Sequence, residues 1–449
     1  MNFNFDKQEF PKFPGIKKAL GPGIIWLALA QGSGELIWWP YFIAKYGTAL
    51  LPLLIPSALI QLPLTYHIGK YSMLTGESIW RGFFRLSKKL TLVLWILMNL
   101  SFFWFGSFVV AGGTALSELI PLGLSKKVES TIFGYILIIL MFIMLIKAKK
   151  TYQIVEKFMW FVAVGTSTGL LISCLHPQVI KNLKDFIIGF FKLKISVVEP
   201  KDYEELITAI TFMGLGGFWS LFYSYWIKEK GFGMSQKIIG FEYGAIPSKD
   251  SAEIKKWNKA LFLDSSVGIF GNIITTLMTC FLAFSILHPQ GLLPEGYKIA
   301  VVQSEFFRGW FGDIGVKIFL FSSALFLIDT WISTADSVAK TNVDFIKMLI
   351  PVKDTQKLYK ILLVAITIIT LITLPIAPPG ELIVISAMIG FVGMVIFSFL
   401  ILFIHVKMRK LLPKSAQIKS PGIVIFSLTG ISYLGLFILY ILEKILTKF

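Results

Sequence analysis

Long apolar runs alternate with short polar and mostly basic stretches along the whole chain. Each run has about the 20 residues that an α-helix needs to cross a hydrocarbon layer of roughly 30 Å. Eleven such runs cover residues 20–44, 48–68, 91–121, 131–146, 155–175, 204–226, 260–287, 317–339, 359–376, 381–404 and 421–442. The pattern predicts an all-α integral membrane protein with about 11 transmembrane helices.

The first run is interrupted at its middle. Between two apolar halves stand Gln31, Gly32, Ser33, Gly34 and Glu35. A broken helix in hydrocarbon leaves backbone groups unpaired at a cost of several kcal/mol each, so a break persists only where protein buries it or where it borders a cavity. We therefore expect these five residues to bind the substrate.

The sixth run repeats this feature. Gly214, Gly216 and Gly217 fall within four residues near its middle, followed by Trp219 and Ser220. Each glycine costs about 1 kcal/mol relative to alanine inside a helix, so the cluster predicts a second break. These five residues complete the predicted substrate site, although Trp219 is equally suited to lining the site and to packing.

Two interrupted segments five helices apart are typical of transporters built from inverted repeats, with the binding site near the membrane midplane. The predicted organisation is a cytoplasmic segment 1–19, a first repeat 20–175, an extracytoplasmic loop 176–203, a second inverted repeat 204–404, and a cytoplasmic loop with an extra helix 405–449. In the loop, the apolar stretch 186–191 suggests a short interfacial helix.

Composition and charge agree with a membrane protein. Of 449 residues, 55% are hydrophobic and 15% charged, and the mean hydropathy is +0.74. The net charge is +17, and 30 of the 43 Lys and Arg lie in the segments on the same side as the N-terminus. Positive residues favour the cytoplasm, so we expect a cell-membrane protein with a cytoplasmic N-terminus and an extracytoplasmic C-terminus. The basic surplus thus orients the helices, and we expect the lipid bilayer rather than nucleic acid as partner.

Three short motifs stand out along the chain: Gly21-Pro22-Gly23, Leu74-Thr75-Gly76 and Gly113-Thr114-Ala115. They resemble motifs of the Nramp family of divalent-metal transporters, which has the leucine-transporter-type fold. The resemblance implies a secondary transporter, not an enzyme, that works by alternating access, needs no cofactor and is driven by an ion or proton gradient.

The metal-binding motifs of that family are not retained. Where the family has Asp-Pro-Gly-Asn in helix 1, this chain has Gly32, Ser33, Gly34 and Glu35, and the Met-Pro-His of helix 6 is replaced by residues within 217–220. The remaining oxygen donors suit hard cations rather than soft ones. We therefore expect transport of a hard divalent metal cation, without the usual manganese and iron selectivity, and Glu35 is the predicted metal ligand.

Helix 8 offers candidates for binding the coupling ion. Asp329, Ser333 and Asp336 are spaced to share one helical face, and Asp329 lies near mid-depth. Asp329 is predicted to bind the coupling proton or Na⁺, and Ser333 and Thr334 resemble a hydroxyl pair that binds sodium in this fold. Asp336 and Lys340 are expected to form a surface ion pair.

Two alternatives remain open at this stage. One is an ion- or proton-coupled transporter of a small organic solute, such as an amino acid or organic acid, with Glu35 or Asp329 serving coupling. The other is a transport-inactive sensor or scaffold on the same fold. For Glu35 itself, a structural role as a protonated or salt-bridged group is the competing interpretation.

Several other polar and aromatic residues are predicted to have structural roles. Trp38 and Trp39 are expected to anchor helix 1 at the membrane interface. Asp264 and Asn272 are expected to form hydrogen bonds between helices. The four histidines lie near helix ends and are predicted to form no cluster.

Overall fold

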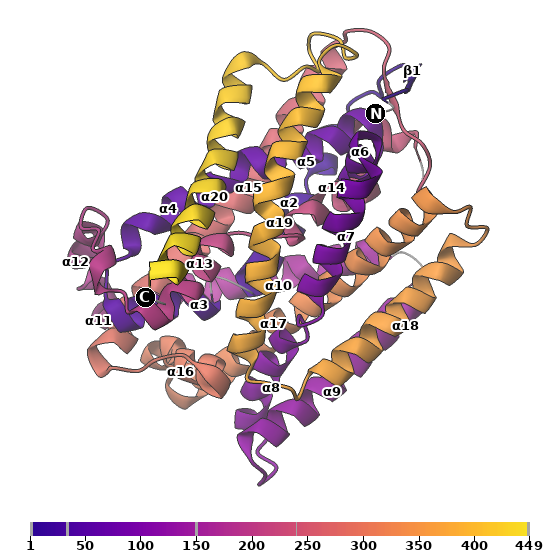
Figure 1. Cartoon of the computed structure of the whole chain (residues 1–449). Coiled ribbons are helices and arrows are strands. Elements are labelled where there is room, and N and C mark those ends of the chain that lie inside the picture. Colours follow the sequence, from indigo (N-terminus) through magenta and orange to yellow (C-terminus); the bar gives the residue numbers. More distant parts are fainter. Residues whose placement is uncertain (1–2, 33–35, 149–150, 239, 447–449) are drawn as a thin grey trace.

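The computed structural model describes residues 3–32, 36–148, 151–238 and 240–446. The chain is a bundle of helices of very different lengths (Figure 1). The α-helices are α1 Ile16–Ala19, α2 Pro22–Ala30, α3 Leu36–Tyr46, α4 Leu51–Leu59, α5 Gln61–Thr75, α6 Ile79–Leu86, α7 Lys88–Phe102, α8 Ser107–Leu119, α9 Lys126–Lys147, α10 Thr151–Cys174, α11 Pro177–Ile180, α12 Leu183–Gly189, α13 Tyr203–Thr211, α14 Trp219–Lys230, α15 Ala252–Leu282, α16 Ile299–Gln303, α17 Glu305–Leu349, α18 Thr355–Thr373, α19 Pro379–Met408 and α20 Ser420–Leu446.

Nine helical stretches within the described residues are long and apolar enough to cross a membrane. They coincide with nine of the eleven predicted runs. The sixth run is divided into two short helices, α13 and α14. The first run holds α2 and α3, and residues 33–35 between them lie outside the described residues. The prediction of an all-α membrane protein is confirmed.

Two long runs deviate from the simple pattern. The third run forms α7 and α8, with a turn over 103–106 between them. Helix α17 extends well beyond the predicted 317–339, and it kinks at Gly312, whose φ is 55°. Glycine tolerates this left-handed conformation because it has no Cβ.

The short elements lie around the bundle. Helix α12 falls on the predicted interfacial stretch of the 176–203 loop, and its Ile187 and Ile188 side chains are exposed. Near the N-terminus, strand β1 (Asp6–Gln8) pairs in parallel with β2 (Ala245–Pro247). This pairing ties the start of the chain to the segment between α14 and α15.

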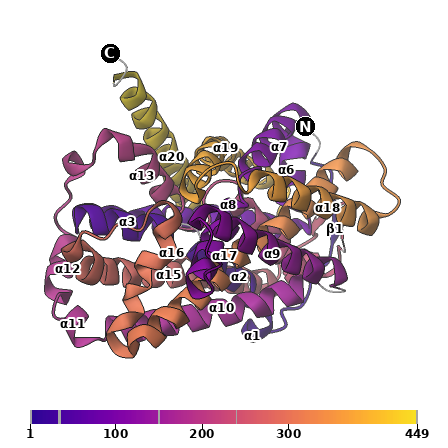
Figure 2. The ribbon, with the colours of Figure 1, turned by 90° about the horizontal axis from the view of Figure 1, so that it is seen from below.

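Helix α2 lies inside the bundle, in contact with α10, α14, α15 and α17. Seen from below, α2, α8 and α17 occupy the middle of the molecule, whereas α18 and α20 lie at its edge (Figure 2). Helix α2 is therefore surrounded by protein, which is where a transmembrane helix can end without exposing its backbone to lipid.

Candidate functional site

The second predicted break is present. Helix α13 ends at Thr211 and α14 begins at Trp219, and between them Gly216 and Gly217 have φ values of 60° and 47°. A Cβ at Gly217 would lie 2.9 Å from the Cα of Gly390 in α19. Only glycine allows both this conformation and this close approach of two backbones.

A side chain from α5 satisfies the backbone freed by this break. The Nε2 of Gln61 donates a hydrogen bond of 2.9 Å to the carbonyl oxygen of Thr211, the last residue of α13. Gln61 is buried, so this bond replaces the water that a helix end would otherwise bind. Sequence reasoning missed Gln61, although a lone amide in an apolar run was a visible signal.

Gly214 brings the two interrupted helices together. A Cβ at this position would lie 2.7 Å from the Cη2 of Trp26 in α2 and would also overlap the Gln61 amide. The absence of a side chain thus allows the segment between α13 and α14 to pack directly on α2.

Trp219 connects the second break to α17. Its Nε1 donates a hydrogen bond of 2.8 Å to the hydroxyl of Thr334. Its ring lies 4.5 Å from that of Phe102 and 5.5 Å from that of Phe212, both edge to face. Trp219 is buried among aromatic rings, and Ser220 beside it is buried as well.

The first predicted break falls partly outside the described residues. Helix α2 ends at Ala30, Gln31 and Gly32 continue in helical turns, and α3 begins at Leu36. Three predicted substrate residues, Ser33, Gly34 and Glu35, lie outside the described residues.

Gln31 is described and buried. Its Nε2 donates a hydrogen bond of 3.2 Å to the hydroxyl of Ser167 in α10. Its Oε1 accepts no hydrogen bond from any residue that the structure describes. Within the described residues, this side-chain oxygen is thus a free acceptor at the end of α2.

Gly32 packs against α17. A Cβ on Gly32 would lie 2.5 Å from the carbonyl oxygen of Phe326 and 3.4 Å from the Oδ1 of Asp329, and it would overlap the Thr330 hydroxyl. The predicted coupling residue therefore lies beside the end of α2, although 297 positions separate Gly32 from Asp329 in the sequence.

Asp329 is fully buried, and its charge is poorly compensated. The Thr330 hydroxyl lies 3.5 Å from its Oδ1, at the outer limit of a hydrogen bond, and its Oδ2 has no partner within the described ranges. A bare carboxylate at such a place is very unfavourable, so the group carries a proton or meets a cation.

The hydroxyls that follow on α17 differ from each other. Ser333 is buried, and its Oγ has no partner among the described residues. Thr334 accepts the Trp219 bond and so links α14 to α17. The described part of the chain holds no group of three His, Cys, Asp or Glu residues that could bind a metal ion. The unpartnered oxygens of this region, among the described residues, are those of Gln31 at the end of α2 and of Asp329 and Ser333 on α17.

Asp264 caps the N-terminus of α2. Its carboxylate accepts hydrogen bonds from the backbone N–H groups of Gly21 at 3.0 Å and Gly23 at 2.7 Å, and from the Tyr223 hydroxyl at 2.7 Å. The predicted role of Asp264 between helices is confirmed. The same prediction is wrong for Asn272, whose buried amide has no hydrogen-bond partner in the described part of the chain.

Three other sequence predictions are wrong because they assumed that the side chains are exposed at the surface of the protein. Asp336 and Lys340 form their ion pair inside the protein, where Glu229 also contacts Lys340 at 2.6 Å. Trp39 is buried, and its indole donates to the carbonyl oxygen of Ala209 at 3.0 Å. Trp38 is largely buried too.

Two of the histidines meet. The rings of His67 and His405 lie 4.7 Å apart, and the Nε2 of His405 lies 2.8 Å from the backbone oxygen of His67. These residues come from α5 and α19. The prediction that the histidines form no cluster did not foresee this pair, because it considered only positions along the sequence. Within the described residues the pair is not part of a group of three potential metal ligands.

A cavity of about 500 Å³ lies between α3, α13, the start of α19 and the segment before α16. Four carboxylic acids line it, together with the aromatic side chains Trp38 and Tyr41: Glu204, Glu205, Glu295 and Glu381. Of these, Glu204 is paired with Lys444 at 2.6 Å. The cavity favours positively charged solutes over negatively charged ones.

No protein-family model matches the chain. An uncharacterized protein of Pasteurella multocida is 23% identical over 442 residues, which cover 95% of this chain and 92% of that protein. Among solved structures, a mutant of the Eremococcus coleocola manganese transporter is similar with a TM-score of 0.68 at 12% identity, covering 96% of this chain and 88% of that chain.

A structure of the same transporter in complex with an aromatic bis-isothiourea substituted compound has a TM-score of 0.64 at 12% identity, and the match covers 97% of this chain and 89% of that chain. A nucleobase-cation-symport-1 family transporter in a closed conformation, with bromovinylhydantoin bound, has a TM-score of 0.50 at 11% identity and covers 97% and 95%. These likenesses establish the fold: the chain is an all-α membrane protein with the architecture of these transporters.

Proposed function

We propose that this protein is a secondary active transporter that moves a small cation across the cell membrane by alternating access. The observation that carries the proposal is Asp329, a fully buried carboxylic acid with an unpartnered oxygen among the described residues, beside the end of α2. Asp329 lies on the long helix α17, beside the end of α2. A group there that must gain or lose a proton or a cation suits ion coupling.

The proposed substrate is a hard divalent metal cation bound by oxygen atoms. The free Oε1 of Gln31 and the predicted ligand Glu35 both belong to the segment between α2 and α3. Carbonyl and carboxylate oxygens are the ligands that such cations prefer. The acidic cavity beside α3 favours the approach of a cation from that end of the bundle.

For the coupling ion, we propose Asp329 together with Ser333. The Ser333 hydroxyl is free within the described residues, whereas that of Thr334 already accepts the Trp219 N–H. Thr334 then serves chiefly to position α14 on α17, and its oxygen retains one lone pair for a proton-bearing group or Na⁺.

The orientation follows from the distribution of basic residues. We propose two inverted repeats over 20–175 and 204–404, a cytoplasmic N-terminus and an extracytoplasmic C-terminus. Protease accessibility of tags at the two ends in sealed right-side-out vesicles tests this orientation. Digestion of the C-terminal tag alone is expected.

Uptake into proteoliposomes tests the function. Mg²⁺, Ca²⁺ and Mn²⁺ are offered with an imposed proton or Na⁺ gradient to the wild type, Asp329→Asn and Glu35→Gln. We expect gradient-driven uptake by the wild type, loss of gradient dependence in Asp329→Asn, and loss of cation uptake in Glu35→Gln. The matched control is Asp313→Asn, an exposed carboxylate of the same helix, which should transport normally.

Two results would contradict the proposal. Gradient-driven flux of an amino acid or organic acid, with no cation uptake, would assign the protein to organic-solute transport. No flux of any offered solute by folded wild-type protein would favour a sensor or scaffold. Thermal unfolding of each variant separates loss of transport from loss of folding.

A further inference from the structure

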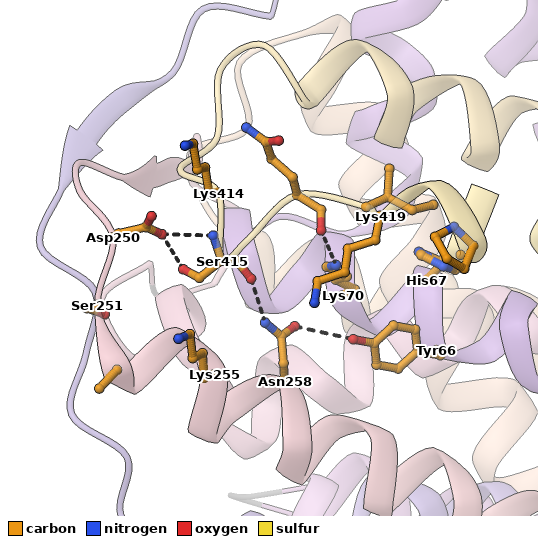
Figure 3. A pocket seen from close by; sticks show the side chains of 15 residues that line it. Tyr66, His67, Lys70, Asp250, Ser251, Lys255, Asn258, Lys414, Ser415 and Lys419 are labelled. Atoms are coloured by element: carbon orange, nitrogen blue, oxygen red, sulfur yellow. Dashed lines mark hydrogen bonds between the residues drawn. The ribbon is translucent and has the colours of Figure 1, made fainter.

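A second and larger cavity lies far along the chain from either helix break. It has a volume of about 890 Å³ and is enclosed by α5, the beginning of α15, and the segment from 414 to the first turn of α20 (Figure 3). None of its lining residues takes part in the transport site described above. It therefore calls for a separate explanation.

Positive charge dominates this cavity. Four lysines line it: Lys70, Lys255, Lys414 and Lys419. None of them forms an ion pair with a carboxylate of the described residues. The single acidic residue of the wall, Asp250, is engaged by the backbone N–H of Ser415 at 2.8 Å and by the Ser415 hydroxyl.

Lys70 is the buried lysine of this cavity, and no carboxylate of the described residues pairs with its charge. It is only 5% exposed, and its Nζ donates to the carbonyl oxygen of Gln417 at 3.3 Å. An ammonium group has three donors, and burial of its charge is costly without an opposite charge beside it. The neighbouring His67 is also buried, and its Nδ1 has no partner in the described ranges.

The wall of the cavity is held in place by neutral hydrogen bonds. Asn258 of α15 donates to the carbonyl oxygen of Ser415 and accepts from the Tyr66 hydroxyl, each at 3.3 Å. Figure 3 shows this chain of contacts crossing the cavity from the 414–419 segment to α5. These hydrogen bonds connect the three segments that carry the lysines, so the lysines belong to one packed structure and not to independent surface loops.

Helix α20 begins at the cavity and continues along the membrane-facing surface of the bundle. Pro421 and Gly422 of its first turn line the cavity, and the positive end of the helix dipole at that turn favours an anion. Directly after them, Val424, Ile425 and Leu428 are more than half exposed on the outer side of the bundle. An apolar face that continues from a basic cavity matches a molecule with an anionic head and hydrocarbon chains.

We propose that this cavity binds the phosphate group of an anionic phospholipid, whose acyl chains lie along the exposed face of α20. Basic pockets between transmembrane helices on the cytoplasmic side are suited to such head groups, and the proposed orientation puts the cavity on that side. The site does not depend on what the protein transports.

Native mass spectrometry of the purified full chain tests the proposal. The probes are phosphatidylglycerol and phosphatidylcholine with identical acyl chains, and inorganic phosphate alone. We expect the wild type to retain phosphatidylglycerol in preference to phosphatidylcholine. Each removed lysine should weaken phosphatidylglycerol binding about fivefold.

The variants are Lys70→Met, and a double variant with Lys255→Gln and Lys419→Gln. Both positions of the double variant are exposed, so its folding is not at risk, whereas Lys70→Met changes a buried residue. The matched control is Lys360→Gln, an exposed lysine of α18 outside the cavity, which should keep the wild-type preference.

Loss of the preference in both cavity variants, with the control unchanged, supports the site. Displacement of phosphatidylglycerol by inorganic phosphate also supports it, because the shared chemistry is the phosphate. Equal retention of the two lipids by the wild type, or an unchanged preference in the double variant, would overturn the proposal. Binding of inorganic phosphate without any retention of phosphatidylglycerol would overturn the assignment to lipid.

Discussion

The indole N–H of Trp219 donates to the Thr334 hydroxyl over 2.8 Å, and this bond joins the second interrupted helix to α17. Thr334 lies five residues after Asp329 on the same helix. The bond therefore links the break between α13 and α14 to α17, the helix that carries the buried carboxylic acid Asp329. A change in the break between α13 and α14 can thus be transmitted to α17 through this contact.

Replacement of Thr334 by valine should destabilise the protein by about 1–3 kcal/mol, because the buried indole N–H loses its acceptor. Thermal unfolding in detergent measures the change. The control is Thr367→Val in α18, because the Thr367 hydroxyl donates to the carbonyl oxygen of Leu363 in its own helix.

The pair can be examined further with a double-mutant cycle. Trp219→Phe removes the donor, so adding Thr334→Val to it should cost clearly less than Thr334→Val alone. Strictly additive effects of the two substitutions would show that the hydrogen bond contributes nothing.

Gly217→Ala should strongly destabilise the fold. The new Cβ would lie 2.9 Å from the Cα of Gly390, and the φ of 47° is unfavourable for alanine. Gly240 provides a matched control, because its φ is 64° but no atom lies within 4 Å of the position of a Cβ.

Gly240→Ala should thus show only the conformational cost, on the order of 1 kcal/mol. Gly217→Ala should show that cost plus the steric overlap, measured as a markedly lower unfolding temperature. Similar unfolding temperatures for the two variants would mean that α19 can move away from the break at little cost.

Gln61→Met should cost about 1–3 kcal/mol, because the Thr211 carbonyl at the end of α13 would be left unpaired inside the protein. Gln290→Met is the control, since the Gln290 amide is exposed and bonds to its own helical segment. Thermal unfolding of both variants measures the difference. An unchanged unfolding temperature for Gln61→Met would indicate that the carbonyl finds another donor.

Asp344→Asn should be the most destabilising of the charge changes. Asp344 is fully buried, with the Nε of Arg81 at 2.7 Å and the Tyr225 hydroxyl at 3.2 Å. Burial opposes the charge on Arg81, but the charge and hydrogen bond of Asp344, together with Glu77 and Tyr225, outweigh it and raise the pKa of the guanidinium. Removing one partner of such a pair costs about 3–5 kcal/mol.

The control for this substitution is Glu118→Gln, whose ion pair with Lys126 is about half exposed. Exposed pairs contribute about 1 kcal/mol or less. Chemical unfolding of the two variants compares them directly, and equal losses of stability would contradict the structural role of the buried pair.

The sequence by itself determined which segments span the membrane and where the helix between residues 204 and 226 is interrupted. Length and hydropathy decide whether a segment suits a membrane, and both are local properties of the chain. The glycines at 214, 216 and 217 likewise marked an interruption because their cost in a helix interior is local. These features could be predicted without any knowledge of which helices touch.

Only the tertiary structure decided which residues meet. Gln61 reaches Thr211, Asp264 reaches Gly21, and Gly32 lies against Asp329, in pairs separated by 150 positions or more. For the same reason Asp336 and Trp39 proved to be buried where local reasoning expected exposure. A contact between distant segments depends on the packing of whole helices. A short stretch of sequence therefore cannot indicate which distant residue it will contact.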